Sequence, residues 1–306
     1  MRADDDVMDK RRYLWLGAII ISTLAAMQLT ACGSEGAGVV PRLDSVDAAS
    51  SVLSTASTLR AAPTPATGPS PTPKIWILQG PGLEAAAMAK DPEGIKFFSN
   101  PSRTVMYPVI ADVSAPSSWK TILWQKYDSF AAFQSDIANG VVPLGTKVVG
   151  YDDEAWPATP VGEQNDPIGY TIKFAQLAHA HGYKMISMPA EDLMHGLSQG
   201  ETKFTAFINY GMAKAVAPYV NYYHLQAQDL EVTPAAYVSY VKTIVAQVHG
   251  ANPDVIVTGG VATASPETAA EIDATIEASR ELLSGYWFNI VGQTTPIASE
   301  ALTNLH

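Results

Sequence analysis

Short apolar runs alternate with segments of helical periodicity from Lys74 to the end of the chain. The runs are rich in β-branched and aromatic residues, and their length is typical of buried strands. Strands that are each followed by a helix indicate parallel βαβ units. Seven such runs are evident, at 75–78, 105–110, 148–151, 184–188, 219–225, 255–258 and 286–291.

Polar caps and glycines mark the expected ends of several helices. A polar residue followed by proline favours a helix start, and it occurs at Asp166-Pro167, Thr233-Pro234 and Ser265-Pro266. Glycines that we expect to follow the last turn of a helix are Gly182, Gly250 and Gly285. A further helix is expected over 201–217, where apolar residues recur at a core-facing spacing.

This repeat predicts an α/β fold, a (β/α)8 barrel of the TIM type over residues 74–306, which is a sufficient length for that fold. No Gly-rich phosphate loop follows any of the runs, so a nucleotide-binding open sheet is disfavoured. The eighth strand is expected at 121–126, with a helix over 128–139 that ends at Gly140. If residues 118–139 instead form one amphipathic helix, the barrel is irregular or seven-stranded.

Residues 1–32 have the parts of a secretory signal. A basic triplet at 10–12 precedes an apolar run over 13–27, and the sequence Leu-Thr-Ala-Cys then ends at Cys32. This arrangement resembles the lipobox of bacterial lipoproteins. The resemblance implies a cleaved signal peptide, lipidation of Cys32 and attachment to the extracytoplasmic face of the cell membrane. An uncleaved membrane helix is the alternative, and translation from Met8 is a second open point.

Residues 33–73 are rich in Ser, Thr, Ala, Gly and Pro and contain few large apolar side chains. Such a composition cannot bury enough surface to order itself, so we expect a tether between the membrane and the barrel.

Composition excludes several classes of protein. The formal net charge of −11 and the lack of a basic stripe argue against a nucleic-acid partner. A single cysteine rules out intramolecular disulfides and cysteine metal clusters. The six histidines are scattered without metal-ligand spacing, so we expect neither a metal nor another cofactor. A monomer is expected.

An acidic stretch follows the run at 148–151. Asp152, Asp153 and Glu154 are consecutive, and Trp156-Pro157 comes directly after them. Side chains alternate across a strand, so Asp152 and Glu154 share one face and Asp153 points to the other. Barrel enzymes place their chemistry at this end of the strands. The alternative is a solvated acidic loop.

Polar and aromatic residues follow the other runs too, and in a barrel they converge on one mouth. Amides, carboxylates and flat rings suit carbohydrate, whose hydroxyls need hydrogen bonds and whose C–H faces stack on rings. We therefore expect a glycan or polysaccharide substrate. The residues expected at the mouth are Gln79, Asp112, Gln125 or Tyr127, Asp152, Asp153, Glu154, Trp156, Glu191, Asp192, Gln226, Gln228, Asp229 and Gln293.

The acidic stretch resembles the signature Asp-x-x-Asp-x-Asp-x-Glu of the chitinase-like barrel glycosidases, which lies at the end of their fourth strand. Glu154 matches the acid of that signature, Asp152 the neighbouring aspartate, and Trp156-Pro157 the aromatic residue and proline that often follow, shifted by one position. Gly150 and Lys147 stand where two further aspartates belong, so half of the signature is absent.

Glycoside hydrolysis needs one carboxylic acid to protonate the leaving oxygen and a second group to stabilise or attack the sugar. We expect Glu154 to be the acid and Asp152 to orient it or share its proton. Asp192, Glu191 or Asp229 would act from across the mouth, and Gln226 and Gln228 would bind hydroxyls or polarise an acyl group. The competing interpretation is a non-catalytic lipoprotein that binds a glycan or a protein through the same mouth.

Overall fold

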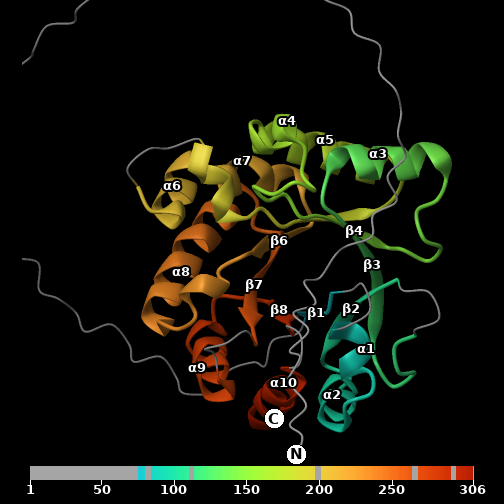
Figure 1. Cartoon of the computed structure of the whole chain (residues 1–306), viewed down its shortest axis with the longest axis vertical. Coiled ribbons are helices and arrows are strands. Elements are labelled where there is room, and N and C mark those ends of the chain that lie inside the picture. Colours follow the sequence, from blue (N-terminus) through green and yellow to red (C-terminus); the bar gives the residue numbers. More distant parts are fainter. Residues whose placement is uncertain are drawn as a thin grey trace, which may run out of the picture. The chain divides into compact units, whose positions relative to one another are not determined.

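The computed structural model describes residues 75–79, 84–109, 114–196, 201–263, 268–290 and 294–305, all in one compact unit (Figure 1). The signal peptide, Cys32 and the tether predicted over 33–73 lie outside these residues. Asp112 and Gln293 do so as well.

The core of the fold is a closed barrel of eight parallel strands, each paired with its neighbours in chain order. The predicted (β/α)8 barrel is therefore confirmed. The eighth strand lies where it was expected, since β3 covers 121–127, and the alternative of one helix over 118–139 is wrong. The strands are β1 (Ile75–Ile77), β2 (Thr104–Pro108), β3 (Thr121–Tyr127), β4 (Val148–Tyr151), β5 (Lys184–Ser187), β6 (Tyr222–Leu225), β7 (Ile256–Ala262) and β8 (Gly285–Asn289).

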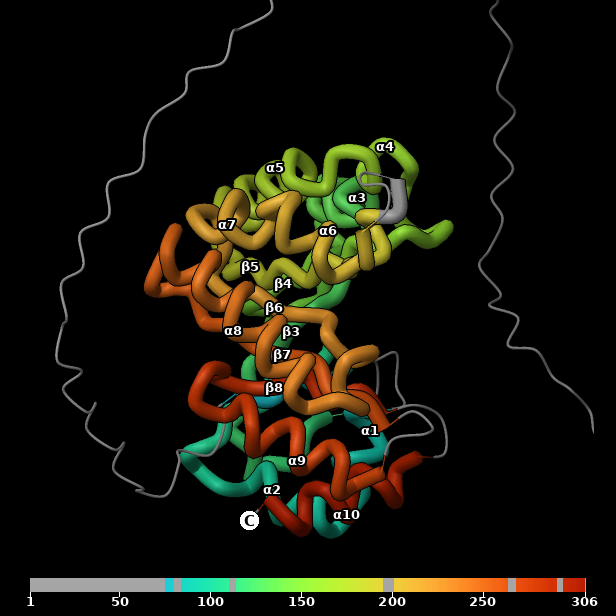
Figure 2. The backbone as a smooth tube through the Cα atoms, turned by 90° about the vertical axis from the view of Figure 1, so that its left-hand side faces the viewer, coloured from blue at the N-terminus to red at the C-terminus, as the bar shows by residue number. Residues whose placement is uncertain are grey.

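Helices surround the strands and follow one another around the barrel (Figures 1 and 2). They are α1 (Glu84–Met88), α2 (Pro92–Phe98), α3 (Phe130–Asn139), α4 (Val161–Gln164), α5 (Pro167–Ala180), α6 (Lys203–Tyr210), α7 (Met212–Val216), α8 (Pro234–Ala251), α9 (Ala269–Ser279) and α10 (Thr295–Asn304). Within the described ranges the 3-10 helices are η1 (Glu191–Gly196), η2 (Ala217–Tyr219) and η3 (Gln228–Leu230). In the described part of the chain, no helix is long and apolar enough to cross a membrane.

The predicted helix starts are confirmed for α5 and α8, both of which begin at the expected proline. Asp166 caps α5 by accepting a hydrogen bond from Gly169 N at 3.0 Å. The start of α9 differs from the prediction. Its N-cap is Thr268, which forms a reciprocal capping box with Glu271. Ser265-Pro266 lies outside the described residues.

The predicted helix ends are confirmed at Gly182 and Gly140, which follow α5 and α3 with φ of 79° and 64°. Gly250 lies inside α8, so its assignment as a stop is wrong. Gly285 opens β8, where a Cβ would lie 1.9 Å from the carbonyl oxygen of Ile75, and a side chain is therefore excluded by strand pairing. The helix expected over 201–217 is broken at Gly211, which has φ 72°.

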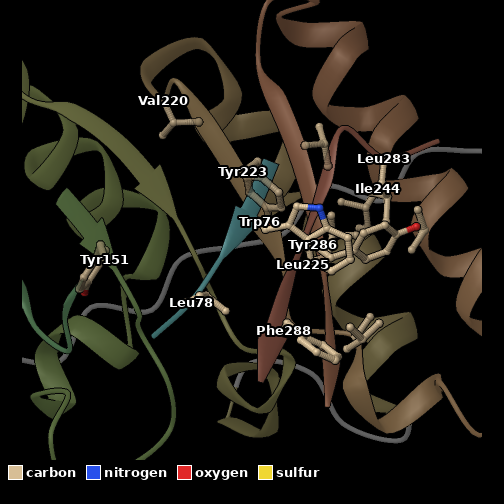
Figure 3. Packing of buried hydrophobic residues seen from close by; sticks show 14 of the residues in the cluster. Trp76, Leu78, Tyr151, Val220, Tyr223, Leu225, Ile244, Leu283, Tyr286 and Phe288 are labelled. Atoms are coloured by element: carbon tan, nitrogen blue, oxygen red, sulfur yellow. The ribbon is translucent and has the colours of Figure 1, made fainter. Parts of the chain in front are cut away.

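Strand alternation separates two hydrophobic layers. One fills the barrel interior, and the other lies between the strands and the helices. In the outer layer Trp76 packs edge-on against Phe97, with ring centroids 5.0 Å apart, and lies beside Tyr286 and Phe288 (Figure 3). Burying one large apolar side chain contributes about 1.5–3 kcal/mol. The inner layer consists of Ile77, Met106, Trp124, Val148, Ile186, Met188, Tyr222 and Trp287.

Candidate active site at the carboxyl end of the barrel

Three polar side chains meet inside the barrel above the inner apolar layer. Lys126, Asp152 and Gln226 stand on β3, at the end of β4 and at the end of β6, and each continues the inward-facing side of its strand. Asp152 is almost completely buried and accepts a hydrogen bond from Gln226 Nε2 at 2.7 Å. Gln226 Nε2 also donates to Met188 O at 2.8 Å, which fixes the amide across the mouth.

Lys126 is the cation of this cluster. Its ammonium nitrogen lies 2.6 Å from Asp152 Oδ2 and 2.6 Å from Asp128 Oδ1. Burial would lower the pKa of Lys126, but the charges of the two aspartates raise it above its ordinary value. Burial raises the pKa of Asp152, and the ammonium opposes that shift. The ammonium therefore offsets part of the cost of placing a carboxylate inside the barrel.

Glu154 is half-buried at the edge of this cluster. Burial and, after it, the charges of Asp152 and Asp192 raise the pKa of Glu154, Lys126 and Gln226 oppose the shift, and the net result is a pKa of about 7. A carboxyl group with this pKa holds its proton on about half of the molecules at neutral pH. It is the one acid of the cluster poised to give and take a proton in that range.

The loop after β4 is held in place by side chains from neighbouring segments. Asp192 Oδ1 accepts a hydrogen bond from Ala155 N at 3.1 Å, which ties η1 to this loop. The indole of Trp156 donates to Thr159 Oγ1 at 3.0 Å, and its ring centroid lies 5.3 Å from the Lys126 ammonium nitrogen. An aromatic face thus lies beside the charged cluster.

Gln228 reaches the mouth from η3. Gly260 faces the barrel interior on β7, and a Cβ there would lie 2.7 Å from Gln228 Cδ. The missing side chain therefore makes room for the amide. Asp229, the next residue, is exposed and pairs with Lys203 on α6. It does not join the cluster around Glu154.

Several residues expected at the mouth point into the outer layer instead. Tyr127 packs on Phe133, with centroids 5.0 Å apart, and its hydroxyl donates to Asp136 Oδ2 at 3.1 Å. Glu191 accepts a hydrogen bond from Tyr240 of α8 at 2.7 Å. The expected position of these residues at the mouth is wrong, since both turn away from it. Gln125, the alternative to Tyr127, also lies on the outward side of β3, in register with the outward-facing Val149.

Asp153 also turns outward, as alternation predicts. It is completely buried, and neither of its carboxyl oxygens has a hydrogen-bond partner among the described residues. Burial raises the pKa of Asp153 well above its ordinary value, and the nearby acids Asp152, Glu163 and Glu154 add to the shift. The surroundings behind the barrel wall therefore favour the protonated form of Asp153, and its expected role in substrate binding is not supported by its position.

Two groups near the mouth were not expected from the sequence, the half-buried Glu84 and the buried His224. Glu84 of α1 accepts hydrogen bonds from Gln79 N at 2.9 Å and from the Trp287 indole at 3.4 Å. Burial raises the pKa of Glu84 to about 8. His224 lies inside the barrel, 3.0 Å from Thr258 Oγ1 through Nδ1, and burial lowers the pKa of its imidazole to about 3. Gln79 thus lies at the mouth as expected, beside Glu84.

The sequence carried one usable signal for Lys126. Ile122, Trp124 and Lys126 occupy alternate positions of one strand, so once the first two face inward the third must as well. No comparable signal exists for Glu84, because it does not directly follow a strand but is the first residue of the short helix α1. No cluster of three or more His, Cys, Asp or Glu side chains suited to a metal ion occurs among the described residues.

Comparison with known proteins gives the chain no family. No protein-family model matches it, and no curated protein matches it. Among solved structures, the spore cortex-lytic enzyme SleL of Bacillus megaterium QM B1551 is 10% identical with a TM-score of 0.47, covering 77% of this chain and 74% of that one. Hydroxymethylglutaryl-CoA lyase from Pseudomonas aeruginosa is 12% identical with a TM-score of 0.46, covering 73% and 78%. A Schiff base forming fructose-1,6-bisphosphate aldolase is 12% identical with a TM-score of 0.44, covering 76% and 94%. These likenesses are too weak to carry a functional argument, which must come from the site itself.

Proposed function

We propose that the chain is a glycoside hydrolase that is held at the extracytoplasmic face of the membrane by a lipid on Cys32 and acts on a polysaccharide or another glycan. The observation that carries the enzymatic part is Glu154, a half-buried carboxyl group with a pKa of about 7 at the carboxyl end of β4. β4 is also the fourth strand of the barrel, the position that the signature of chitinase-like glycosidases occupies.

In this proposal Glu154 protonates the oxygen of the leaving sugar. A general acid works best when its pKa lies near the working pH, because it then holds the proton and still releases it readily. The charge of Asp152 lies beside it and favours the positive charge that develops on the sugar ring in the transition state. As the bond between the anomeric carbon and the leaving oxygen breaks, the proton passes from Glu154 to that oxygen. A water oxygen then bonds to the anomeric carbon, and the Glu154 carboxylate takes up the proton that the water loses.

The neighbouring residues fit the binding of a sugar. The Gln226 amide, which is fixed by two hydrogen bonds, has its oxygen available for a hydroxyl or an amide of the substrate. The half-buried Trp156 ring beside Lys126 would stack on the sugar, and Gln228 supplies a second amide over Gly260. Asp192 is the second carboxylate close enough to influence Glu154.

The direct test is Glu154→Gln, which keeps the volume and removes the ionisable proton. We expect a loss of about 10²–10⁴-fold in hydrolysis rate with little change in stability. Rates would be measured on a panel of polysaccharides and aryl glycosides, with Glu277→Gln on the exposed face of α9 as the matched control. Hydrolysis that survives Glu154→Gln undiminished would remove this residue from the mechanism.

The anchor is tested separately. Metabolic labelling with a fatty-acid analogue is expected to tag the wild-type chain and not the Cys32→Ala variant. Equal labelling of both chains would refute lipidation at this cysteine.

A non-catalytic glycan-binding lipoprotein is the second candidate, and one observation favours it. A Cβ at Gly150 would lie 2.9 Å from the ring of Trp124 and 3.2 Å from Ile186, so the aspartate of the glycosidase signature has no room there. If this candidate is correct, glycan binding will be measurable by calorimetry while neither the wild type nor Glu154→Gln hydrolyses any member of the panel.

A further inference from the structure

Three lysines gather at the amino end of the barrel, opposite the candidate active site. Lys120 precedes β3, Lys147 precedes β4 and Lys184 opens β5, and these three strands are neighbours. Lys184 N donates to Lys147 O at 3.0 Å, so the two residues lie side by side. All three side chains are exposed, and none forms an ion pair with a described carboxylate. On a chain with a net charge of −11, this is a local excess of positive charge.

An exposed aliphatic loop lies beside these lysines. Leu144 is 97% exposed and Val141 is 57% exposed, on the connection between α3 and β4 that also carries Lys147. Figure 1 shows this connection swinging out from the end of α3 before it returns to β4. Leu144 remains in water after folding, so its side chain contributes almost no hydrophobic stabilisation to the fold. Its exposure therefore suggests a use outside the folded domain.

A hollow of about 450 Å³ connects the loop and the lysines. It is lined by Gly145, Lys147, Lys184 and Tyr222, with residues of β3 on the remaining side. Asp254 and Glu281 stand before β7 and β8 on the other half of the rim, while on the basic half Asp136, in the last turn of α3, accepts a hydrogen bond from the Tyr127 hydroxyl. The rim is thus divided into a basic half with protruding aliphatic side chains and an acidic half. We call the basic half the lysine–leucine face, consisting of Lys120, Val141, Leu144, Lys147 and Lys184.

We propose that the lysine–leucine face docks on a bilayer that contains anionic phospholipid, with Leu144 and Val141 entering the interface and the three lysines binding lipid phosphates. Protruding aliphatic side chains surrounded by lysines are the combination that binds such surfaces. The described chain begins at Ile75, at the amino end of β1, so the segment that leads to Cys32 joins the barrel at this same end. The inference rests on the proposed lipid anchor, and it adds that the barrel is oriented with its mouth away from the membrane.

The orientation can be measured with one label on the lipidated full chain. Cys32 is the only cysteine, so Leu144→Cys introduces the only thiol that remains free after lipidation. A polarity-sensitive fluorophore at position 144 would be followed in phosphatidylcholine vesicles with and without phosphatidylglycerol, using brominated acyl chains as quenchers. We expect a blue shift and quenching in the anionic vesicles and a reversal by salt. Each lysine of the face changed to alanine is expected to lower the docked-to-undocked ratio about fivefold.

The matched control is Val161→Cys, an aliphatic residue that is 68% exposed on α4, after the carboxyl end of β4. Its label should stay in water in all vesicles. A label at 144 that also stays in water, on a chain that floats with the vesicles, would overturn the docking while leaving the anchor intact. A chain that does not float with anionic vesicles would overturn the anchor and the docking together. A blue shift that grows with protein concentration without vesicles would instead identify a second copy of the chain as the partner and overturn the proposal.

Discussion

Asp152 and Asp153 are adjacent, both buried, and opposite in their surroundings. Asp152 faces the barrel interior, where Lys126 Nζ lies 2.6 Å from one carboxyl oxygen and Gln226 Nε2 2.7 Å from the other. Asp153 faces the helices, where neither oxygen has a partner among the described residues. One aspartate is thus compensated as a charged group, and the other is tolerated only as a neutral acid.

The difference follows from strand geometry alone, since consecutive side chains point to opposite faces. It also separates function from stability. The inner aspartate lies in the charged cluster beside Glu154 and adds to the burial that raises the pKa of that acid, whereas the outer one makes the stability of the fold depend on pH. Substitutions on the two faces should therefore differ in kind, and the following predictions are ordered from the largest expected effect to the smallest.

Lys126→Met tests the surroundings of the inward-facing Asp152. It leaves Asp152 buried without its cation, and we expect a loss of about 3 kcal/mol in the free energy of unfolding at neutral pH. Chemical denaturation measures this loss, with Lys120→Met at an exposed position as the control. Adding Asp152→Asn should restore most of the stability, because no charge then remains to compensate. If Lys126→Met is as stable as the wild type, the ion pair between Lys126 and Asp152 does not stabilise the fold.

Asp153→Asn tests the protonation of the outward-facing Asp153. Because the pKa of Asp153 is raised in the native state, the native chain keeps a proton that the unfolded chain loses above its ordinary pKa. Stability of the wild type therefore falls as pH rises above about 4, by up to about 1.4 kcal/mol per pH unit until the native pKa is reached. We expect Asp153→Asn to remove this contribution, so that its advantage over the wild type grows by up to about 3 kcal/mol between pH 5 and pH 7.

The comparison variant is Asp152→Asn, measured over the same pH range. Burial raises the pKa of Asp152 too, but Lys126 opposes the shift, so we expect no comparable gain. If wild type and Asp153→Asn have parallel profiles of unfolding free energy against pH, Asp153 is not protonated in the folded chain.

Gly259 and Gly260 offer the same comparison on β7. A Cβ at Gly259 would lie 2.4 Å from the Tyr237 hydroxyl and 2.7 Å from Leu283, within the outer layer. Gly259→Ala should therefore cost about 1–3 kcal/mol of unfolding free energy. A Cβ at Gly260 meets only the end of Gln228, which can move aside, so Gly260→Ala should cost less than about 1 kcal/mol while weakening glycan binding. Equal losses of stability would contradict the inside–outside assignment.

The fold could be predicted from the sequence because its signals are local. Apolar runs gave the positions of seven strands, the eight-strand repeat then called for β3, and Asp166 and Thr233 with their prolines marked two helix starts. The prediction that a glycine ends the preceding helix was wrong where the glycine instead allows two strands to pair, as at Gly285 beside Ile75. A glycine that ends a helix and one that allows two strands to approach look the same in a single sequence.

The site was predictable only in part. Alternation correctly separated Asp152 from Asp153. The sequence did not decide which residues of β3 face the barrel interior, so Tyr127 was expected at the mouth in place of Lys126. Glu191 was misplaced because η1 turns its carboxyl group toward Tyr240, a contact between residues 49 positions apart. Glu84 depends on Trp287 of the last strand, and no local pattern connects them.

The close approach of Trp124 to Gly150 has a consequence for the history of this barrel. The indole occupies the space of any side chain at 150, and its Nε1 donates to Leu78 O at 3.0 Å, so the ring cannot readily swing away. An aspartate at 150 would clash with Trp124, and a smaller residue at 124 would leave a cavity, so either change alone is expected to destabilise the barrel. In an alignment of relatives of this chain, these two columns should therefore covary, with glycine accompanying tryptophan and larger residues at 150 accompanying smaller ones at 124.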